Sequence, residues 1–235
     1  MSARPPLMRG LFVTATDTGV GKTVVAGAII AALRARGERV AAFKPVVTGL
    51  DQPAEPGWPR DHELLAAAAG TRPEAVAPSE FGPPVSPHLA AELAGVDLNL
   101  DAMVVAASAA AADAGASVLI AEGVGGLLVP LTREDSVRDL AVALGFPLVV
   151  AARPGLGTIS HTLLTLEAAR AAGLTVAGVV ITPWPEHPSV MELSNRATVA
   201  RLGAVGVATL PLLRDGSPPS LAAAGATLPL SEWLR

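Results

Sequence analysis

The sequence predicts an α/β fold with a doubly wound, mainly parallel sheet that is flanked by helices. Short runs rich in Val, Leu and Ile alternate with longer alanine-rich stretches along the chain, the pattern of strands joined by helical crossovers. The short runs are continuously apolar, as expected for strands covered on both faces. The chain has 235 residues, about the size of one large domain, and similar strands lie on both sides of its two proline-rich segments. We therefore expect a single domain over residues 1–235.

The expected elements follow in chain order. The first strand, residues 11–16, leads to a helix over residues 24–36, which ends with two arginines and Gly37, the usual signals of a helix C-terminus. In the second strand, residues 39–47, Pro45 must lie at the very end because it has no amide hydrogen. The remaining strands are expected at residues 117–123, 147–152, 175–182 and 205–210, the remaining helices at residues 61–69, 100–114, 136–144, 159–172 and 188–202, and loops at residues 51–60 and 72–87. In such sheets ligands bind beyond the carboxyl ends of the strands.

Composition and charge exclude several classes of protein. Hydrophobic residues are 51% and charged residues 16% of the chain, which excludes intrinsic disorder. The net charge of −4 indicates no basic surface for nucleic acid or anionic lipid. The absence of cysteine excludes disulfides, thiol catalysis and cysteine-ligated metals. The apolar stretches are interrupted before about 18 residues, and no apolar signal-peptide core follows Arg4 and Arg9. We expect a cytoplasmic protein that binds neither nucleic acid nor membrane.

The end of the first strand carries a phosphate-binding motif. Glycines let backbone N–H groups point at a phosphate, and a helix N-terminus adds the positive end of its dipole. Lys22 would reach the β- and γ-phosphates, and the Thr23 hydroxyl would ligate Mg²⁺. Thr16 replaces the first glycine of the strict motif, but the strand and helix on either side are the context that the motif requires. The strand runs into Asp17-Thr18-Gly19-Val20-Gly21-Lys22-Thr23.

Charged residues also lie near two other strand ends and at a helix start. Lys44 would either balance charge beside bound phosphates or remain a surface lysine with its ammonium in water. Glu122 ends an apolar strand and precedes three glycines in four residues, so its carboxylate must be paired or bind a cation such as the Mg²⁺ of a nucleotide. Asp61 is a possible second carboxylate, although its spacing alone favours a helix N-cap. Ser86 is expected to cap the following helix and leave His88 exposed.

Two further features leave their roles open. A second glycine turn, at residues 155–158, leads into a helix and would either hold an anion or be a plain strand–helix turn. Trp58, Trp184 and Trp233 are isolated in the sequence. They therefore indicate no aromatic platform for nucleic-acid bases.

Taken together, five segments resemble those of the dethiobiotin synthetase family. They occur in the order of the family and extend from about residue 11 to about residue 215. A phosphate loop alone would not make the resemblance specific. The second segment, residues 44–49, and the fourth, residues 122–131, make it so. The segments are Thr16-Asp17-Thr18-Gly19-Val20-Gly21-Lys22-Thr23, Lys44-Pro45-Val46-Val47-Thr48-Gly49, Ser86-Pro87-His88-Leu89-Ala90-Ala91, Glu122-Gly123-Val124-Gly125-Gly126-Leu127-Leu128-Val129-Pro130-Leu131 and Leu156-Gly157-Thr158-Ile159-Ser160-His161.

The resemblance implies an ATP-dependent cyclo-ligase of biotin synthesis. One amine of 7,8-diaminopelargonic acid takes up CO₂ as a carbamate, and the carbamate oxygen attacks the γ-phosphate of ATP. The second amine attacks the resulting carbamic-phosphoric anhydride, closes the ureido ring of dethiobiotin and expels phosphate. A carbamate is a poor electrophile until its oxygen carries a phosphate, so the main demands are alignment and neutralisation of negative charge.

The resemblance also implies roles for particular residues. Lys22 and Lys44 would be the catalytic residues that flank the carbamate and the γ-phosphate. Thr48 would contact the diamine, and in a homodimer Gly157 and Ser160 of the partner subunit would meet the substrate carboxylate. Mg²⁺ would be surrounded by Thr23, Asp61 and Glu122. The nucleotide would be contacted by Gly19, Val20, Gly21, Lys22, Thr23, Val24, Asp61, Glu122, Gly123, Val124, Gly125, Thr182, Pro183, Leu210, Pro211 and Leu212.

The chain departs from the family pattern at three places. Ala15 stands where glycine is usual, and Ser160 where asparagine is usual. Thr182-Pro183 replaces the asparagine that reads adenine. Thr182 offers a single hydroxyl and Pro183 has no amide hydrogen, so we expect weak discrimination among nucleoside triphosphates.

Two alternative functions also use a phosphate loop but fit the rest of this sequence less well. A related amidotransferase-type synthetase would carry a fused glutaminase domain with a catalytic cysteine, and this chain has no cysteine. A partition or positioning ATPase usually has an extra lysine early in the phosphate loop, and residues 15–18 contain none. Such ATPases also tend to have a membrane-binding tail, whereas residues 228–235 are short and weakly charged.

Overall fold

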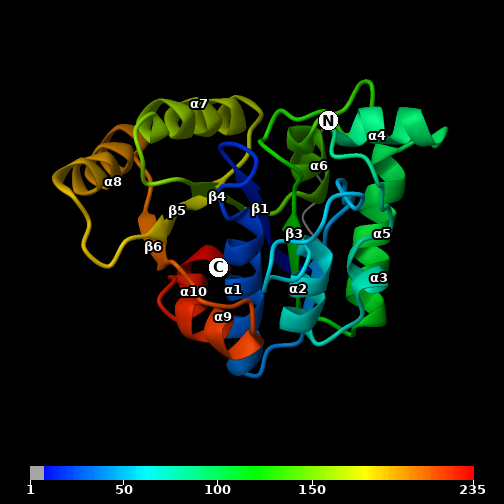
Figure 1. The fold of residues 1–235 in the computed structure, drawn as a ribbon, viewed down its shortest axis with the longest axis horizontal. Coiled ribbons are helices and arrows are strands. Elements are labelled where there is room, and N and C mark those ends of the chain that lie inside the picture. Colours follow the sequence, from blue (N-terminus) through cyan, green and yellow to red (C-terminus); the bar gives the residue numbers. More distant parts are fainter. Residues whose placement is uncertain (1–7) are drawn as a thin grey trace.

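The structure is a computed structural model that describes residues 8–235, and six strands form a single sheet through its middle (Figure 1). The strands lie in the order β2-β3-β1-β4-β5-β6, and all their pairings are parallel. The first strand along the chain therefore lies between β3 and β4, and its carboxyl end opens near the centre of one edge. The strands are β1 (Arg9–Ala15), β2 (Val40–Phe43), β3 (Val118–Glu122), β4 (Leu148–Ala152), β5 (Val176–Trp184) and β6 (Val207–Pro211).

Helices cover both faces of the sheet, which confirms the predicted doubly wound α/β fold. On one face lie α1 (Lys22–Ala35), α2 (Asp61–Ala69), α3 (Pro73–Val76), α9 (Pro218–Gly225) and α10 (Leu230–Trp233). On the other face lie α4 (Pro87–Ala94), α5 (Leu100–Asp113), α6 (Val137–Leu144), α7 (Thr158–Ala171) and α8 (Val190–Gly203). Within residues 8–235, none of the helices is both long and apolar enough to cross a membrane. The first residues of the predicted domain, and Arg4 with them, lie outside the described part of the chain.

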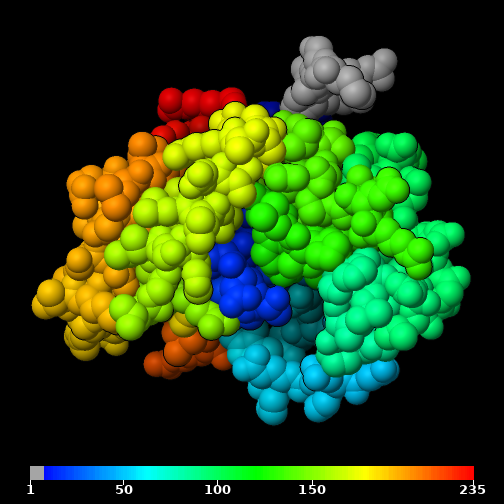
Figure 2. Space-filling view, turned by 90° about the horizontal axis from the view of Figure 1, so that it is seen from above, coloured from blue at the N-terminus to red at the C-terminus, as the bar shows by residue number. Residues whose placement is uncertain are grey.

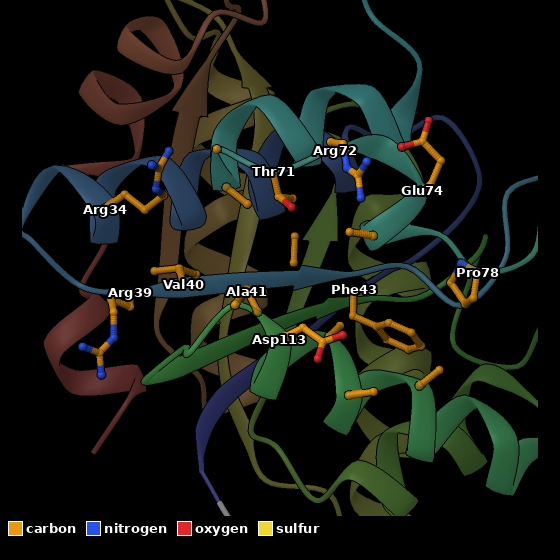
Figure 3. A pocket seen from close by; sticks show the side chains of 18 of the residues that line it. Arg34, Arg39, Val40, Ala41, Phe43, Thr71, Arg72, Glu74, Pro78 and Asp113 are labelled. Carbon is orange, nitrogen blue, oxygen red and sulfur yellow. The ribbon is translucent and has the colours of Figure 1, made fainter.

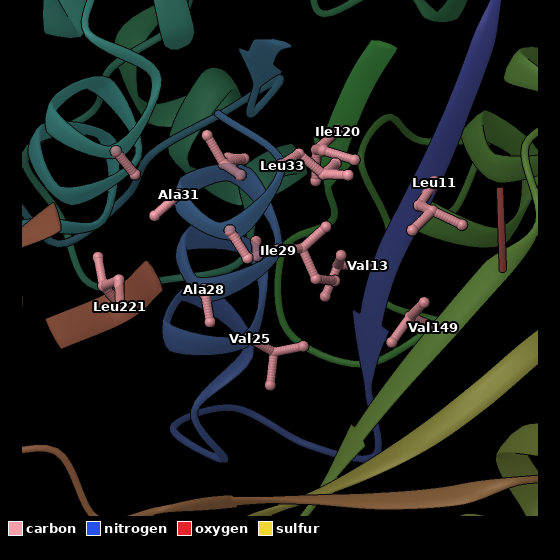
Figure 4. Packing of buried hydrophobic residues seen from close by; sticks show 14 of the residues in the cluster. Leu11, Val13, Val25, Ala28, Ile29, Ala31, Leu33, Ile120, Val149 and Leu221 are labelled. Atoms are coloured by element: carbon pink, nitrogen blue, oxygen red, sulfur yellow. The ribbon is translucent and has the colours of Figure 1, made fainter. Parts of the chain in front are cut away.

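The central helix α1 fills the core on its face of the sheet. Val25, Ile29 and Leu33 are at most 3% exposed and pack among strand residues such as Val13 and Ile120 (Figure 4). On its other side α1 contacts α9 so closely that a Cβ at Gly225 would overlap the carbonyl oxygen of Ala28. This packing fixes the N-terminus of α1 at the end of β1.

The second strand is shorter than predicted. We expected it to reach residue 47, but β2 ends at Phe43, two residues before Pro45. Beyond that point the chain leaves β3 and pairs with residues 76–81 instead: the Lys44 amide donates to Val76 O, and the Val47 amide donates to Ser79 O, both at 2.9 Å. Because Pro45 has no amide hydrogen, it cannot continue a regular ladder. The change of partner carries Lys44 and Thr48 to the edge where ligands are expected.

Two short helices that begin with proline, α3 and α9, were missed, whereas α4 is the helix expected after Ser86. Residues 72–87 were expected to be a loop, but they contain α3 and the start of α4. Both helices, like α9, carry proline in the first turn, where its missing amide hydrogen costs nothing. A proline-rich segment can therefore start a helix as well as form a loop, and composition alone does not separate the two.

Candidate active site

The phosphate loop connects β1 to α1 at the centre of the carboxyl edge. Gly21 is the N-cap of α1 and has φ 89°, a conformation that favours glycine. A Cβ at Gly21 would lie 2.9 Å from Cγ2 of Thr182, so the end of β5 supports the loop closely. Figure 2 shows the blue surface of this stretch in the middle of one face, between the cyan surface near residue 50 and the yellow-green surface near residue 150. The loop is thus open to a ligand from outside.

A buried ionic cluster lies beside the loop. Lys44 Nζ forms ion pairs with Glu122 Oε1 at 2.6 Å and with Asp61 Oδ2 at 3.0 Å. The Thr23 hydroxyl donates to the same Glu122 oxygen at 2.9 Å. Lys44 is only 3% exposed and Glu122 0%, so the surface-lysine alternative does not hold. The structure brings together four residues that the sequence separates by up to 99 positions.

The charges in this cluster shift one another's pKa values. Burial by itself would lower the pKa of the Lys44 ammonium, but Asp61 and Glu122 outweigh it and raise this pKa. The positive charge of Lys44 holds the pKa of the half-exposed Asp61 carboxyl below its usual range. Burial raises the pKa of the Glu122 carboxyl against the opposing effect of Lys44, and burial lowers the pKa of the Lys22 ammonium. Lys44 is therefore protonated at neutral pH.

Lys22, Lys44 and Asp61 line a cavity of about 460 Å³, whereas Glu122 does not line it and lies behind Lys44 and Thr23. On one side lie the phosphate loop and the first turn of α1, and on the other lies the segment between Leu50 and Asp61. The cavity is lined by Thr18, Gly19, Gly21, Lys22, Thr23, Val24, Lys44, Val46, Val47, Thr48, Leu50, Ala54, Glu55, Trp58, Pro59, Arg60, Asp61, Leu64, Val124 and Gly125. Two lysines, glycine amides and the Asp61 carboxylate in this lining suit a triphosphate and its counterion.

The oxygen atoms of the cluster fit a magnesium ion. Glu122 Oε2 is buried and has no hydrogen-bond partner in residues 8–235. Such an atom is costly unless water or a cation satisfies it. Mg²⁺ usually binds one or two carboxylates together with phosphate oxygens and waters. No group of three or more His, Cys, Asp or Glu side chains in the described residues could hold a metal by itself, so phosphates would have to complete the coordination here.

Other residues predicted for the nucleotide do not line this cavity. Val20 is 2% exposed, and a Cβ at Gly123 would clash with Val137, so both pack inside the protein. Thr182 is 2% exposed behind the phosphate loop, and Pro183 is exposed. Leu210 is fully buried in the core, whereas Pro211 and Leu212 are exposed.

The residues predicted to bind the substrate are divided between two places. Thr48 lines the cavity, but Gly157 and Ser160 lie exposed at the start of α7 and do not. Gly157 is the N-cap of α7 with φ 92°, so this second glycine turn repeats the geometry of Gly21. A single chain does not bring the two sets together.

Two predictions about helix caps and one about the exposure of His88 are corrected, in whole or in part. Arg60, not Asp61, is the N-cap of α2, and Asp61 is the first helical residue, with its carboxylate turned to Lys44. Ser86 is the N-cap of α4 but forms no capping bond, since its hydroxyl lies 3.0 Å from Nδ1 of His88. His88 is accordingly only partly exposed.

Sequence reasoning also missed two residues at the site. Trp58 lines the cavity although it is isolated in the sequence. Arg153, just after β4, donates from Nη2 to the carbonyl oxygen of Thr18 at 2.9 Å and so supports the phosphate loop. Neither contact has a local sequence signal: Trp58 lies in a segment expected to be a loop, and Arg153 is 135 positions from Thr18.

A larger cavity, of about 680 Å³, lies along the outer edge of β2 (Figure 3). None of its lining charged side chains is buried. Arg34 donates to Ala68 O at 3.1 Å near the C-terminus of α2, and Arg39 donates to Gly115 O at 2.6 Å just beyond α5. Because these arginines satisfy carbonyl groups at helix ends, we interpret this cavity as structural.

The fold and the site together define a class of protein. A parallel α/β sheet with Gly21-Lys22-Thr23 at a helix start, and a buried carboxylate at the end of the neighbouring strand, is a nucleotide-binding protein of the P-loop type. A family model described as an AAA domain matches residues 9–219.

Comparison with curated proteins identifies the family. An ATP-dependent dethiobiotin synthetase of Anaeromyxobacter dehalogenans (strain 2CP-1 / ATCC BAA-258) is 49% identical over 198 residues, which cover 83% of this chain and 86% of the relative. The protein of the same name from Mycobacterium sp. (strain KMS) is 39% identical over 230 residues, which cover 97% and 98%. The chain belongs to the dethiobiotin synthetase family.

A solved structure supports the fold alone. A chain of the MinC:MinD cell division protein complex of Aquifex aeolicus superposes with a TM-score of 0.56, over 93% of this chain and 93% of that chain. The two sequences are only 11% identical. This similarity shows a shared architecture and carries no argument about activity.

Proposed function

We propose that this protein is an ATP-dependent cyclo-ligase that converts 7,8-diaminopelargonic acid and CO₂ to dethiobiotin, with ADP and phosphate as products. The observation that carries the proposal is the cavity that Lys22, Lys44 and Asp61 line beside a phosphate loop, with Glu122 bonded to Lys44 and Thr23 behind them. Relatives named ATP-dependent dethiobiotin synthetase, which match most of the chain, support it.

The two lysines would manage the charge of the reaction. Lys22, at the positive end of α1, would bind the β- and γ-phosphate oxygens. Lys44 would lie toward the carbamate oxygen that attacks the γ-phosphate. Both ammonium groups are nearly buried, and a fixed positive charge stabilises developing negative charge most strongly where water is excluded.

The reaction balances without a redox partner. Carbamate formation joins one amine to CO₂ and releases a proton. Attack on the γ-phosphate breaks its bond to ADP, and attack by the second amine on the carbamoyl carbon expels phosphate and loses a proton. Thr48, which lines the same cavity as Lys22, would orient the diamine so that its two nitrogens face the same carbon.

Magnesium would be held by Thr23, Asp61 and Glu122 together with the nucleotide. It would neutralise the charge of the phosphate oxygens and orient them. The orphaned Oε2 atom of Glu122 supports this assignment. Because Lys44 pairs with both of these carboxylates in the free protein, it keeps them from being left as unpaired charges before a ligand binds.

We also propose a homodimer that acts in the cytoplasm. Leu156, Leu164 and Leu128 are 92%, 61% and 57% exposed, and a second chain would cover them. Such a partner would bring Gly157 and Ser160 to the substrate carboxylate at the helix N-terminus of α7. The absence of cysteine agrees with a reducing compartment. Sedimentation at micromolar concentration tests this proposal. If the wild type sediments as a monomer and Leu156→Asp sediments in the same way, the dimer is contradicted.

The activity is tested with the purified full chain. Phosphate release should require ATP, the diamine and bicarbonate together. With ¹³C-bicarbonate the product should gain one mass unit relative to unlabelled bicarbonate, because the ureido carbon comes from CO₂. The matched control is Arg39→Ala, whose side chain lies in the structural cavity. Phosphate release that ignores the diamine, or that rises with DNA or lipid vesicles, would contradict the proposal.

A further inference from the structure

Trp58 is the one aromatic side chain that lines the phosphate-loop cavity within the described residues. The chain has four Phe, three Trp and no Tyr. All four Phe and Trp233 are buried in the core. Trp184 packs on the opposite face of the sheet, with the Arg196 guanidinium 6.0 Å from its ring centre. Only Trp58 is therefore placed to meet a ligand in this cavity with its ring.

The loop that carries Trp58 is held firmly. Arg60 Nη2 donates to Leu50 O and Gln52 O, each at 3.0 Å, which closes the segment on itself. The Trp58 amide donates to Glu55 O at 3.0 Å. One side of the residue packs on the core cluster around α1, while the other lines the cavity. A ring held in this way loses little conformational freedom when a ligand binds.

The position of Trp58 relates it to the nucleoside rather than to the phosphates. Val24, in the first turn of α1, lines the same cavity beyond the phosphate-binding amides. A Cβ at Gly216, in the segment that follows β6, would lie 3.3 Å from Cε3 of Trp58. Trp58 thus shares the cavity with the start of α1 and lies against the segment after β6.

The strand end that was expected to read the base has little to offer. The Thr182 side chain is buried against Gly21, Pro183 has no amide hydrogen, and Leu210 is in the core. Polar pockets reject a wrong base strongly only when they leave a buried donor or acceptor unpaired. A π-face, in contrast, stacks on every base.

We propose that Trp58 stacks on the base of the bound nucleoside triphosphate and supplies affinity that does not depend on the identity of the base. The inference rests on the proposed use of ATP, and it assigns the base-binding surface of the same site. It would give the nucleotide a base-binding surface where Thr182-Pro183 stands in place of the adenine-reading asparagine. ATP, GTP, CTP and UTP should consequently bind within about tenfold of one another.

The test compares binding constants with Mg²⁺ present and the diamine absent. Calorimetry gives Kd for the four nucleotides and for inorganic tripolyphosphate with the wild type, Trp58→Ala, Trp58→Phe and, as the matched control, Trp184→Phe. Trp58→Ala should weaken all four nucleotides by about tenfold and leave tripolyphosphate unchanged. Trp58→Phe should retain most of the affinity, and Trp184→Phe all of it. Nucleotides should quench tryptophan emission in Trp184→Phe, and this quenching should be lost in Trp58→Phe.

Several outcomes would overturn the inference. Unchanged nucleotide Kd values in Trp58→Ala would show that the ring does not contact the base. Equal weakening of tripolyphosphate would show that Trp58 only shapes the phosphate loop. Because these measurements need no turnover, failure of the ring-closing assay would leave their result intact, so the two proposals fail separately.

Discussion

At the carboxyl ends of the strands Lys22 and Lys44 are 7% and 3% exposed, whereas at the amino ends Arg34 and Arg39 lie on the surface. The first pair lies where α1 and α2 begin, and the second pair lies where α2 and α5 end. Helix N-termini are positive and C-termini negative. The arginines therefore neutralise the negative charge of the helix C-termini beside them. The lysines instead add positive charge beside the positive N-termini of α1 and α2.

This difference separates a binding site from a structural cavity better than size does. The cavity at β2 is larger, about 680 Å³ against about 460 Å³, but its cations already bind carbonyl oxygens. In the smaller cavity Lys44 is paired with Glu122 and Asp61, but Lys22 has no ion pair in residues 8–235, and its buried ammonium costs free energy until an anion binds. Stored electrostatic cost of this kind is typical of functional sites.

The largest expected effect is that of Lys22→Ala. The loss of a point charge from oxygens that gain charge in the transition state should reduce kcat by about 10²-fold or more. The variant should fold, because it removes a buried cation that burial already disfavours. Steady-state kinetics with a matched unfolding curve checks this. A folded Lys22→Ala protein with a normal kcat would remove the distinction between the two cavities.

Lys44→Ala should be comparably damaging for activity and should also destabilise the protein. Its removal leaves Glu122 buried without its partner, which typically costs about 3–5 kcal/mol. Lys44→Arg should restore activity only in part, since a planar guanidinium does not replace a compact ammonium. Denaturant unfolding and kcat measure the two effects. Full activity in Lys44→Ala would show that the ion pair serves folding alone.

The carboxylates should affect the metal requirement more than the fold. Glu122→Gln and Asp61→Asn each remove one charge and nearly preserve shape, and Mg²⁺ binds through few carboxylates. The Mg²⁺ concentration for half-maximal rate should therefore rise in both variants. Their unfolding midpoints should change less than that of Lys44→Ala. A Mg²⁺ titration at fixed ATP measures this, and an unchanged half-saturation in both would contradict the metal assignment.

The smallest effect is expected at the other end of the sheet. Arg34→Ala removes the hydrogen bond to Ala68 O and should lower the free energy of unfolding by about 1 kcal/mol. Both kcat and KM should stay unchanged, because the side chain lies at the amino ends of the strands. Thermal unfolding and kinetics on the same preparation check this. A tenfold loss of activity would give the larger cavity a function after all.

The sequence predicts what is encoded locally. The phosphate loop is contiguous, and strand–helix alternation has its own periodicity, so both were predicted. The ion pair between Lys44 and Asp61 depends on where the chain turns after β2, which Pro45 decides through a missing hydrogen bond. Spacing alone therefore favoured a helix cap for Asp61.

Trp58 and Thr182 show two ways in which local sequence fails to predict the site: one residue was missed, and the other was placed wrongly. Trp58 is close to the segment around Gly216, far along the chain, so nothing near it in sequence marks it. Thr182 was expected to face the base, but packing turns it to Gly21 instead. Only tertiary packing decides which face a residue at a strand end presents.

The hydrogen bond between Thr23 and Glu122 joins residues 99 positions apart, and this has a consequence for synthesis of the chain. A nascent chain that ends before β3 already contains the whole phosphate motif, residues 17–23, yet it lacks the Glu122 carboxylate that completes the cluster. Parallel pairing of β1 with β3 is a non-local contact and forms slowly compared with a helix. Nucleotide can therefore bind tightly only after the sheet has assembled. ATP then acts as a stabiliser of the native state alone, and its concentration in the cell shifts the balance between completed and incomplete molecules.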